Sequence, residues 1–246
     1  MLGHPRVHLR ETDSTNDRAR ALAIAGAPHG TLVTASAQTA GRGRQGRRWS
    51  APRDSALLAS LVLRSPPRLL PLIAALAVCD VAGDAARVKW PNDIVLAAPP
   101  ILTAGDGGGD ARAGGLAKLA GILTEARPQD GWAVLGIGLN VAVRLEELPA
   151  ELRGLAATLG RGAHQIEPTL ARLLSALERR LAEPTEALLE AYRARDVLRG
   201  REIEWSEGHH RGRAEGIDGE GRLVVALAGG GHTALDAGEV HLRVSA

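Results

Sequence analysis

The longest apolar stretch of the chain, LLPLIAALAVC at residues 69–79, limits the folds open to this sequence. A stretch of this length cannot span a bilayer, and the N-terminal residues carry no apolar segment followed by a cleavage signal. We therefore expect a buried helix in a globular protein of 246 residues, with one catalytic-sized domain and at most one small appendage. The single cysteine, Cys79, lies inside this stretch and cannot form an internal disulfide, which is compatible with the cytoplasmic location that we expect.

Strand-like and helix-like segments alternate on both sides of this stretch. Short runs of apolar or alternating residues predict strands, whereas apolar residues at helical spacing predict helices. Predicted strands cover residues 6–11, 30–38, 55–63, 87–90, 93–97, 116–126 and 131–143, and predicted helices cover 14–25, 68–82, 167–183 and 184–197. This order predicts an α+β fold in which helices flank a mixed β-sheet.

The character of the sequence changes near its C-terminal end. From Arg201 onward, short strand-like runs alternate with glycine turns at the spacing of a small β-barrel. We therefore place a boundary near Arg199, with a catalytic domain at residues 1–199 and a second domain at residues 200–246. The Gly/Ala-rich segment 98–115 is interpreted as a flexible insertion.

Lysine and asparagine are rare in this sequence, and their positions are informative. Of 30 basic residues only Lys89 and Lys118 are lysines, and the only asparagines are Asn16, Asn92 and Asn140. A lysine retained in an arginine-rich chain indicates a place where the planar guanidinium does not fit. Because all five rare residues lie in short polar motifs, we favour functional roles over chance survival at the surface.

The stretch GRGRQGRRW at residues 41–49 concentrates positive charge between two predicted strands. Backbone N–H groups around its glycines can form an anion-binding nest, and the arginines offer forked donors for phosphate or carboxylate. RNA-binding segments use similar residues, but they repeat and lie in disordered ends, whereas this copy is single and internal. The 30 basic and 28 acidic residues of the chain are also interspersed, which argues against a chain-wide nucleic-acid surface.

Several short motifs together resemble one known family. The segments STN at residues 14–16, Gln38, GRGRQGRRW, KWPND at 89–93, KLAGIL at 118–123 and GIGLN at 136–140 resemble those of biotin-protein ligases, in the same order. The C-terminal runs RAEGIDGEGRLVV and AGEVHLR are similar to the small SH3-like domain of that family. The resemblance implies a class II synthetase-like, biotin-lipoate ligase catalytic fold followed by an SH3-like β-barrel.

This resemblance also implies a reaction. The carboxylate of biotin attacks the α-phosphorus of MgATP to give biotinyl-5'-AMP, and a lysine of a biotin carboxyl carrier protein then takes the biotinyl group. Biotin, ATP and Mg²⁺ are thus the expected small molecules, with Mg²⁺ arriving on ATP and no protein metal site. Two anions must meet in the first step, so cations between them are the main catalytic requirement.

The resemblance assigns roles to individual residues. Lys118 and Arg44 are the expected catalytic cations, and Asp93 accepts a proton from the incoming amine, orients it, or only caps a turn. Trp49 covers adenine or belongs to the core, and Lys89 holds phosphate or pairs with a carboxylate. Biotin is expected to contact Ser14, Thr15, Asn16, Gln38, Gly41, Arg42, Gly43, Arg44, Lys118, Gly121, Gly136 and Gly138, and ATP or the adenylate Arg44, Arg47, Trp49, Lys89 and Asn140. The strand glycines allow close approach of the ligand or mark bulges.

Four like charges within residues 41–49 also imply movement of this loop. Ordering about eight residues costs ~1–2 kcal/mol each, so we expect the loop to close only on an anionic ligand and to keep water from the acyl phosphate. The monofunctional type of ligase is expected, without DNA binding, because the catalytic pattern begins within the first dozen residues. No membrane partner is expected, and a homodimer is one option that the sequence leaves open.

Three rival functions remain open at the level of sequence. A lipoate or octanoate ligase shares the catalytic fold, although the GRGRxGR loop argues against it. A second rival is an RNA-binding module that uses the arginine loop to bind RNA. A third is a biotin sensor that binds biotin without transferring it. The insertion at 98–115 is longer than in typical biotin-protein ligases, which puts the loop path near the carrier site in doubt.

Overall fold

The computed structural model describes residues 1–97, 115–206, 208–236 and 240–242. The insertion predicted at 98–115 therefore lies, apart from its last residue, outside the described residues. Within the described ranges, no helix combines the length and the apolar character that crossing a membrane requires.

A seven-stranded mixed sheet forms the centre of the molecule, in the order β1-β2-β3-β7-β6-β5-β4. Strands β1 and β2 pair in parallel, and every other neighbouring pair is antiparallel. The strands are β1 (Arg6–Leu9), β2 (Leu32–Ala35), β3 (Ala56–Arg64), β4 (Arg87–Lys89), β5 (Asp93–Ala97), β6 (Leu116–Arg127) and β7 (Trp132–Asn140). The predicted α+β class and mixed sheet are confirmed, although β2 ends at Ala35 rather than at Gln38, which forms only an isolated bridge with Thr12.

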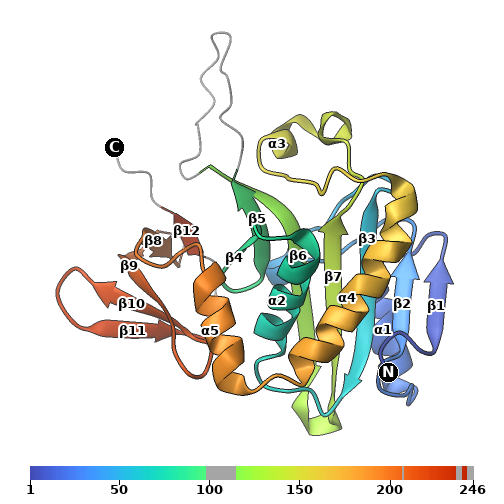
Figure 1. Ribbon diagram of the computed structural model, residues 1–246, viewed down its shortest axis with the longest axis horizontal. Coiled ribbons are helices and arrows are strands. Elements are labelled where there is room, and N and C mark those ends of the chain that lie inside the picture. The colour runs from blue at the N-terminus through green and yellow to red at the C-terminus, as the bar shows by residue number, and fades with distance from the viewer. Residues whose placement is uncertain (98–114, 207, 237–239, 243–246) are drawn as a thin grey trace.

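Helices cover both faces of this sheet (Figure 1). The helices are α1 (Thr15–Ile24), α2 (Leu70–Ala82), α3 (Ala150–Arg153), α4 (Ile166–Leu181) and α5 (Thr185–Arg195), with 3-10 turns η1 (Arg44–Gly46), η2 (Pro128–Asp130), η3 (Leu145–Glu147) and η4 (Ala163–Gln165). Helices α2 and α4 pack on each other and share the main core with one face of the sheet. Helix α1 packs on the other face, where Ala19 and Ala23 contact Val33, Val62 and Val134.

The alternation of side chains along β3 explains these two faces. Leu57, Ala59, Leu61 and Leu63 point into the core shared with α2 and α4. The residues between them therefore point to the opposite face, beside α1. Because that face carries a serine and several glycines of the neighbouring strands, its cover is incomplete and leaves room for a pocket.

A second sheet follows α5 and has five antiparallel strands in the order β11-β10-β9-β8-β12. Its strands are β8 (Glu202–Trp205), β9 (His210–Ile217), β10 (Leu223–Leu227), β11 (His232–Leu235) and β12 (Val240–Leu242). Its apolar residues belong to the same core cluster as α2, and the buried indole of Trp90 donates to the carbonyl of Gly221 at 3.1 Å. The small C-terminal β unit is therefore present, while the domain limits 1–199 and 200–246 stay predictions.

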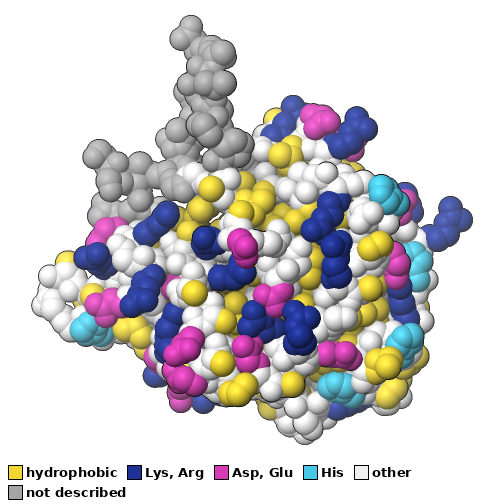
Figure 2. All heavy atoms as spheres, viewed as in Figure 1, with side chains coloured by type: hydrophobic (Ala, Val, Ile, Leu, Met, Phe, Trp, Pro, Cys, Tyr) yellow, Lys and Arg dark blue, Asp and Glu magenta, His cyan; other side chains and the backbone are white. Residues whose placement is uncertain are grey.

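Charges of both signs alternate over the helical face of the molecule. Figure 2 shows Lys and Arg side chains interspersed with Asp and Glu over α2, α4 and α5, without a continuous basic stripe on this face. The distribution expected from the sequence is thus seen on the surface in view.

Candidate functional site

Small residues in two neighbouring strands create a hollow on the α1 face of the sheet. Gly121 of β6 pairs with Gly138 of β7, and Leu123 pairs with Gly136 two residues further along. A Cβ atom on Gly138 would lie 2.5 Å from the Trp49 ring, and one on Gly136 would overlap the side-chain amide of Asn16. Pairing is regular across residues 120–127, so these glycines mark no bulge. They make room for side chains that line the pocket.

Polar groups gather at the α1 end of this hollow. Gln38 Oε1 accepts hydrogen bonds from the Thr15 backbone N–H at 2.7 Å and from the Thr15 hydroxyl at 3.0 Å. The Ser60 hydroxyl lies 2.8 Å from Thr15 Oγ1 and 2.7 Å from Asn16 Oδ1. Ser14 occupies the N-cap position of α1, without a capping hydrogen bond from its side chain, and is buried. These hydrogen-bonded groups form a polar wall that can bind a ligand with several N–H and C=O groups.

The arginine loop folds over the hollow as a narrow hairpin. The backbone N–H of Trp49 donates to the Gly41 carbonyl at 2.9 Å, and the backbone N–H of Gly43 donates to the Arg47 carbonyl at 2.7 Å. Between these two bonds, Arg42 and Arg48 form an antiparallel bridge. The tip turns through Gly46, whose φ of +74° is one that glycine adopts without strain. Trp49 extends from the base of this hairpin onto Gly121 and Gly138.

Positive charge dominates the remaining wall. Among the described residues that line the pocket, six are cationic and Asp93 is the only carboxylate; the cations are Arg42, Arg44, Arg47, Arg48, Lys89 and Lys118. Lys118 Nζ lies 2.7 Å from Asp93 Oδ1 as an ion pair, without the geometry of a hydrogen bond, and 5.8 Å from the centre of the Trp49 ring. Arg44 Nη1 donates to Asn92 Oδ1 at 3.2 Å.

Burial makes this cluster of cations costly in the absence of an anion. Burial lowers the pKa of Lys89 below its ordinary value, Asp93 opposes this change, and Lys118 and Arg47 add to it. Burial also lowers the pKa of Arg44, again opposed by Asp93. An anion in the pocket would relieve both groups, so the site suits carboxylates and phosphates.

The pocket brings together all but two of the residues predicted for the site. The predicted residues that line it are Ser14, Thr15, Asn16, Gln38, Arg42, Gly43, Arg44, Arg47, Trp49, Lys89, Asp93, Lys118, Gly121, Gly136 and Gly138. Gly41 does not line the pocket; it lies at the base of the hairpin, where a Cβ atom would collide with the Trp49 carbonyl. Asn140 is buried and donates to the Ala157 carbonyl at 2.9 Å, so its position gives no support to the predicted contact with adenine.

Sequence reasoning missed several residues of the site. Asn92 stands out as a rare residue of the KWPND motif but received no role, because its contacts join elements far apart in sequence. It accepts from Arg44 and donates to the Ile122 carbonyl at 2.9 Å. Ser60 was available as a signal, because it is the one polar residue in the apolar run ALLASLVL. Asp17 and Glu125 bind Arg42, and Val240 of the C-terminal sheet lines the pocket; no sequence pattern indicated these three.

The described residues hold no group of three or more His, Cys, Asp or Glu side chains that could bind a metal ion. Among its described lining residues, the pocket offers a divalent cation only the Asp93 carboxylate. A magnesium ion in this site would therefore depend on ligand oxygens for most of its coordination.

Two parts of the chain match known families. Residues 9–141 match the biotin/lipoate A/B protein ligase family, and residues 207–243 match the biotin protein ligase C terminal domain. The first match contains the polar wall, the arginine loop and the cationic cluster.

Named relatives are similar over most of the chain. A biotin--[acetyl-CoA-carboxylase] ligase of Mycobacterium tuberculosis is 36% identical over 257 residues, covering 96% of this chain and 88% of that protein. The bifunctional ligase/repressor BirA of Bacillus subtilis is 31% identical over 247 residues, covering 92% of this chain and 70% of that protein. A solved structure of the biotin protein ligase from Aquifex aeolicus, in complex with biotin and ATP, has a TM-score of 0.74 at 25% identity and covers 98% of this chain and 100% of its own.

Proposed function

Because the chain belongs to the biotin/lipoate A/B protein ligase family, we propose that it activates biotin with ATP and transfers the biotinyl group to a lysine of a biotin carboxyl carrier protein. The observation that carries this proposal is the pocket itself, whose described lining places six cationic side chains and one carboxylate beside the polar wall of Thr15, Asn16 and Gln38. Such a pocket suits a ligand with a polar ring at one end and a carboxylate that meets a triphosphate at the other.

In the first proposed step, an oxygen of the biotin carboxylate attacks the α-phosphorus of ATP, and pyrophosphate leaves. Both reactants are anionic, so Lys118 and Arg44 lower the barrier by lying between them. At ~4 Å and an effective dielectric constant near 20, each cation supplies ~4 kcal/mol of Coulomb energy before desolvation is subtracted. Arg47 and Lys89 are proposed to hold the phosphates, and the Trp49 ring to cover the adenine.

In the second proposed step, the carrier lysine amine attacks the acyl carbon, and AMP leaves. The ordinary pKa of a lysine amine, near 10.4, leaves little neutral nucleophile at pH 7, so the amine must be oriented and must lose a proton. Asp93 is the carboxylate available in the pocket, and its ion pair with Lys118 keeps it beside the reacting groups. We assign it the orienting role, with proton acceptance as the alternative.

The remaining assignments rest on the family and on the donor set. Mg²⁺ is proposed to enter with ATP and to neutralise its phosphates, since the described residues offer no metal cluster. The named relatives that are biotin ligases support biotin over lipoate as the substrate. A cytoplasmic location and the absence of DNA binding stay predictions from the sequence.

The test is pyrophosphate exchange into ATP in the presence of biotin, lipoate or octanoate, followed by transfer of labelled biotin to an apo carrier domain. We expect exchange that depends on biotin alone, and label on the carrier but not on a carrier whose target lysine is arginine. Exchange that depends on lipoate or octanoate would replace the proposal with the rival ligase. Retention of RNA in a salt-dependent gel shift, with no exchange, would favour the RNA-binding alternative.

A further inference from the structure

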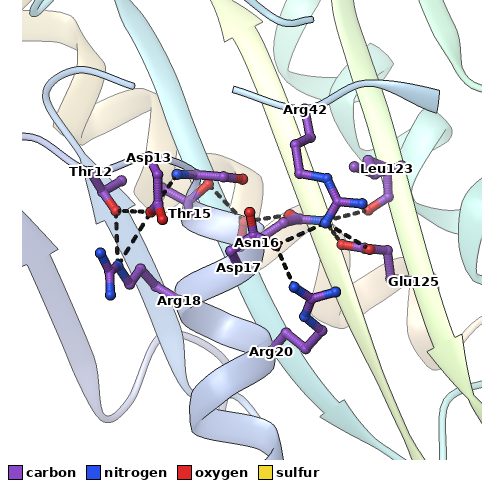
Figure 3. Close-up of polar contacts among 12 residues, drawn as sticks. Thr12, Asp13, Thr15, Asn16, Asp17, Arg18, Arg20, Arg42, Leu123 and Glu125 are labelled. Carbon is purple, nitrogen blue, oxygen red and sulfur yellow. Dashed lines mark hydrogen bonds and ion pairs between the residues drawn. The ribbon is translucent and has the colours of Figure 1, made fainter. Parts of the chain in front are cut away.

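Arg42 links the arginine loop to two elements of the pocket wall. Its Nη1 lies 2.8 Å from Asp17 Oδ1 in α1 and 3.2 Å from Glu125 Oε1 in β6, as Figure 3 shows. Because Arg42 pairs with Arg48 across the loop, fixing Arg42 fixes the base of the hairpin. The other arm is tied by Arg48, which donates to the Thr39 carbonyl at 2.8 Å.

Glu125 contacts the loop and the polar wall with one carboxylate. Its second oxygen, Oε2, accepts a hydrogen bond of 2.8 Å from Asn16 Nδ2. An ionised carboxylate only accepts, so this contact fixes the Asn16 amide with its nitrogen toward Glu125. The Asn16 oxygen is thereby left toward Ser60, 2.7 Å away, on the wall of the pocket.

We propose that Asp17 and Glu125 are positioning residues that hold Arg42, and with it the arginine loop, over the pocket, and that Glu125 couples this closure to the orientation of Asn16. The holding of the loop stands on the contacts alone. The consequence for biotin rests on the proposed function.

The ion pairs of Arg42 with Asp17 and Glu125 are weak enough for the loop to open and close reversibly. The side chains of Arg42, Asp17 and Glu125 are 41%, 28% and 22% exposed, so solvent screens their attraction. Pairs of this kind change an equilibrium by about twofold to fivefold each. Asp17 also keeps a second partner, Arg20 at 2.8 Å, so its charge stays paired when Arg42 leaves. The loop can therefore open without stranding a carboxylate.

The first experiment measures the rate at which an arginine-specific protease cleaves residues 42–48 of the ligand-free full chain. We expect Asp17→Asn and Glu125→Gln each to raise the rate about twofold to fivefold, and the double variant about tenfold. Arg20→Ala is the matched control, because it removes the other partner of Asp17 and touches no loop residue; it should leave the rate unchanged. An unchanged rate in the double variant, or an equal rise in Arg20→Ala, would overturn the proposal.

The second experiment separates the two roles of Glu125 through the KM for biotin. Glu125→Gln keeps an acceptor for Asn16, whereas Glu125→Ala removes it, so KM should rise at least about fivefold more in Glu125→Ala. In a protein that already carries Arg42→Ala, the further change Asp17→Asn should leave the KM for biotin unchanged. Equal KM values in the two Glu125 variants would refute the coupling to Asn16. A protein that turns over no biotin would refute the proposed function, while the cleavage rates would still decide whether Arg42 is held.

Discussion

The two walls of the pocket are built by opposite means. The floor, formed by β6 and β7, is held by continuous backbone pairing and by glycines that leave space for Asn16 and Trp49. The arginine loop is held by its own short hairpin and by half-exposed side-chain contacts of Arg42, Arg44 and Arg48. The floor therefore sets the shape of the pocket, whereas the loop sets access to it and supplies four of the six cations among its described lining residues.

The energetics of the two walls differ in the same way. Ordering each loop residue costs ~1–2 kcal/mol, while half-exposed ion pairs return only ~0.2–1 kcal/mol each. The loop therefore gains from an anion that neutralises its arginines. The floor lies on the buried core and needs no ligand to keep its form.

The largest effect on activity is expected when Lys118, a lysine of the floor, is replaced by arginine. Lys118→Arg keeps the charge, but it replaces the compact ammonium, which lies 2.7 Å from Asp93 Oδ1, with a planar guanidinium that spreads the charge over a fork. We expect pyrophosphate exchange to fall by about 10²–10³. Arg44→Lys, in the arginine loop, should lose less, about tenfold. A near-normal rate of pyrophosphate exchange in Lys118→Arg would show that the floor tolerates this change as well as the loop does.

A second test compares a glycine of the floor with one of the loop. In Gly136→Ala the new methyl group overlaps the Asn16 amide, whereas in Gly43→Ala it meets Arg47 at an ordinary distance of 3.4 Å. Overpacking at Gly136 should cost ~1–3 kcal/mol, which lowers Tm by about 2–10 °C. Thermal unfolding of the ligand-free protein measures this directly. Equal Tm values for the two variants would show that the floor adapts as readily as the loop.

A smaller effect is expected at Lys89, where burial lowers the pKa of the amine. The folded protein disfavours the charged amine, so Lys89→Met should stabilise the ligand-free protein by ~0.5–2 kcal/mol at pH 7. As pH rises toward the ordinary pKa of 10.5, the folded wild type sheds this proton before the unfolded chain does, and its stability approaches that of the variant. Chemical denaturation across this range should show the gap closing; a gap that widens with pH would contradict the assignment.

Much of the floor could be predicted because its signals are local. Strands β6 and β7 follow from apolar runs around a turn, and the glycines and Lys118 stand out in motifs that adjoin in the fold. The core helix α2 was predicted at 68–82 and begins at Leu70, two residues later. Periodicity and composition suffice where each element buries its own apolar face.

The contacts between the walls could not be predicted in the same way. The bond between Asn16 and Glu125 joins residues 109 apart in sequence, and Arg42 reaches α1 across 25 residues. No local pattern encodes such pairs, since any of the 28 acidic residues is an equal candidate for an arginine before the fold is known. The bond from the Asn140 amide to the Ala157 carbonyl is another such contact, and Asn140 is instead predicted at adenine. Ser60 differs, because its place in an apolar run was a local signal.

The central claim is that ligand binding orders the arginine loop and leaves the floor unchanged. Hydrogen exchange of the backbone amides at residues 41–49 and at 116–140, with and without biotin and ATP, compares both walls in one sample. We expect exchange in the loop to slow at least about tenfold on addition of both ligands, with the floor unchanged. Loop exchange that is the same in both samples would contradict the account.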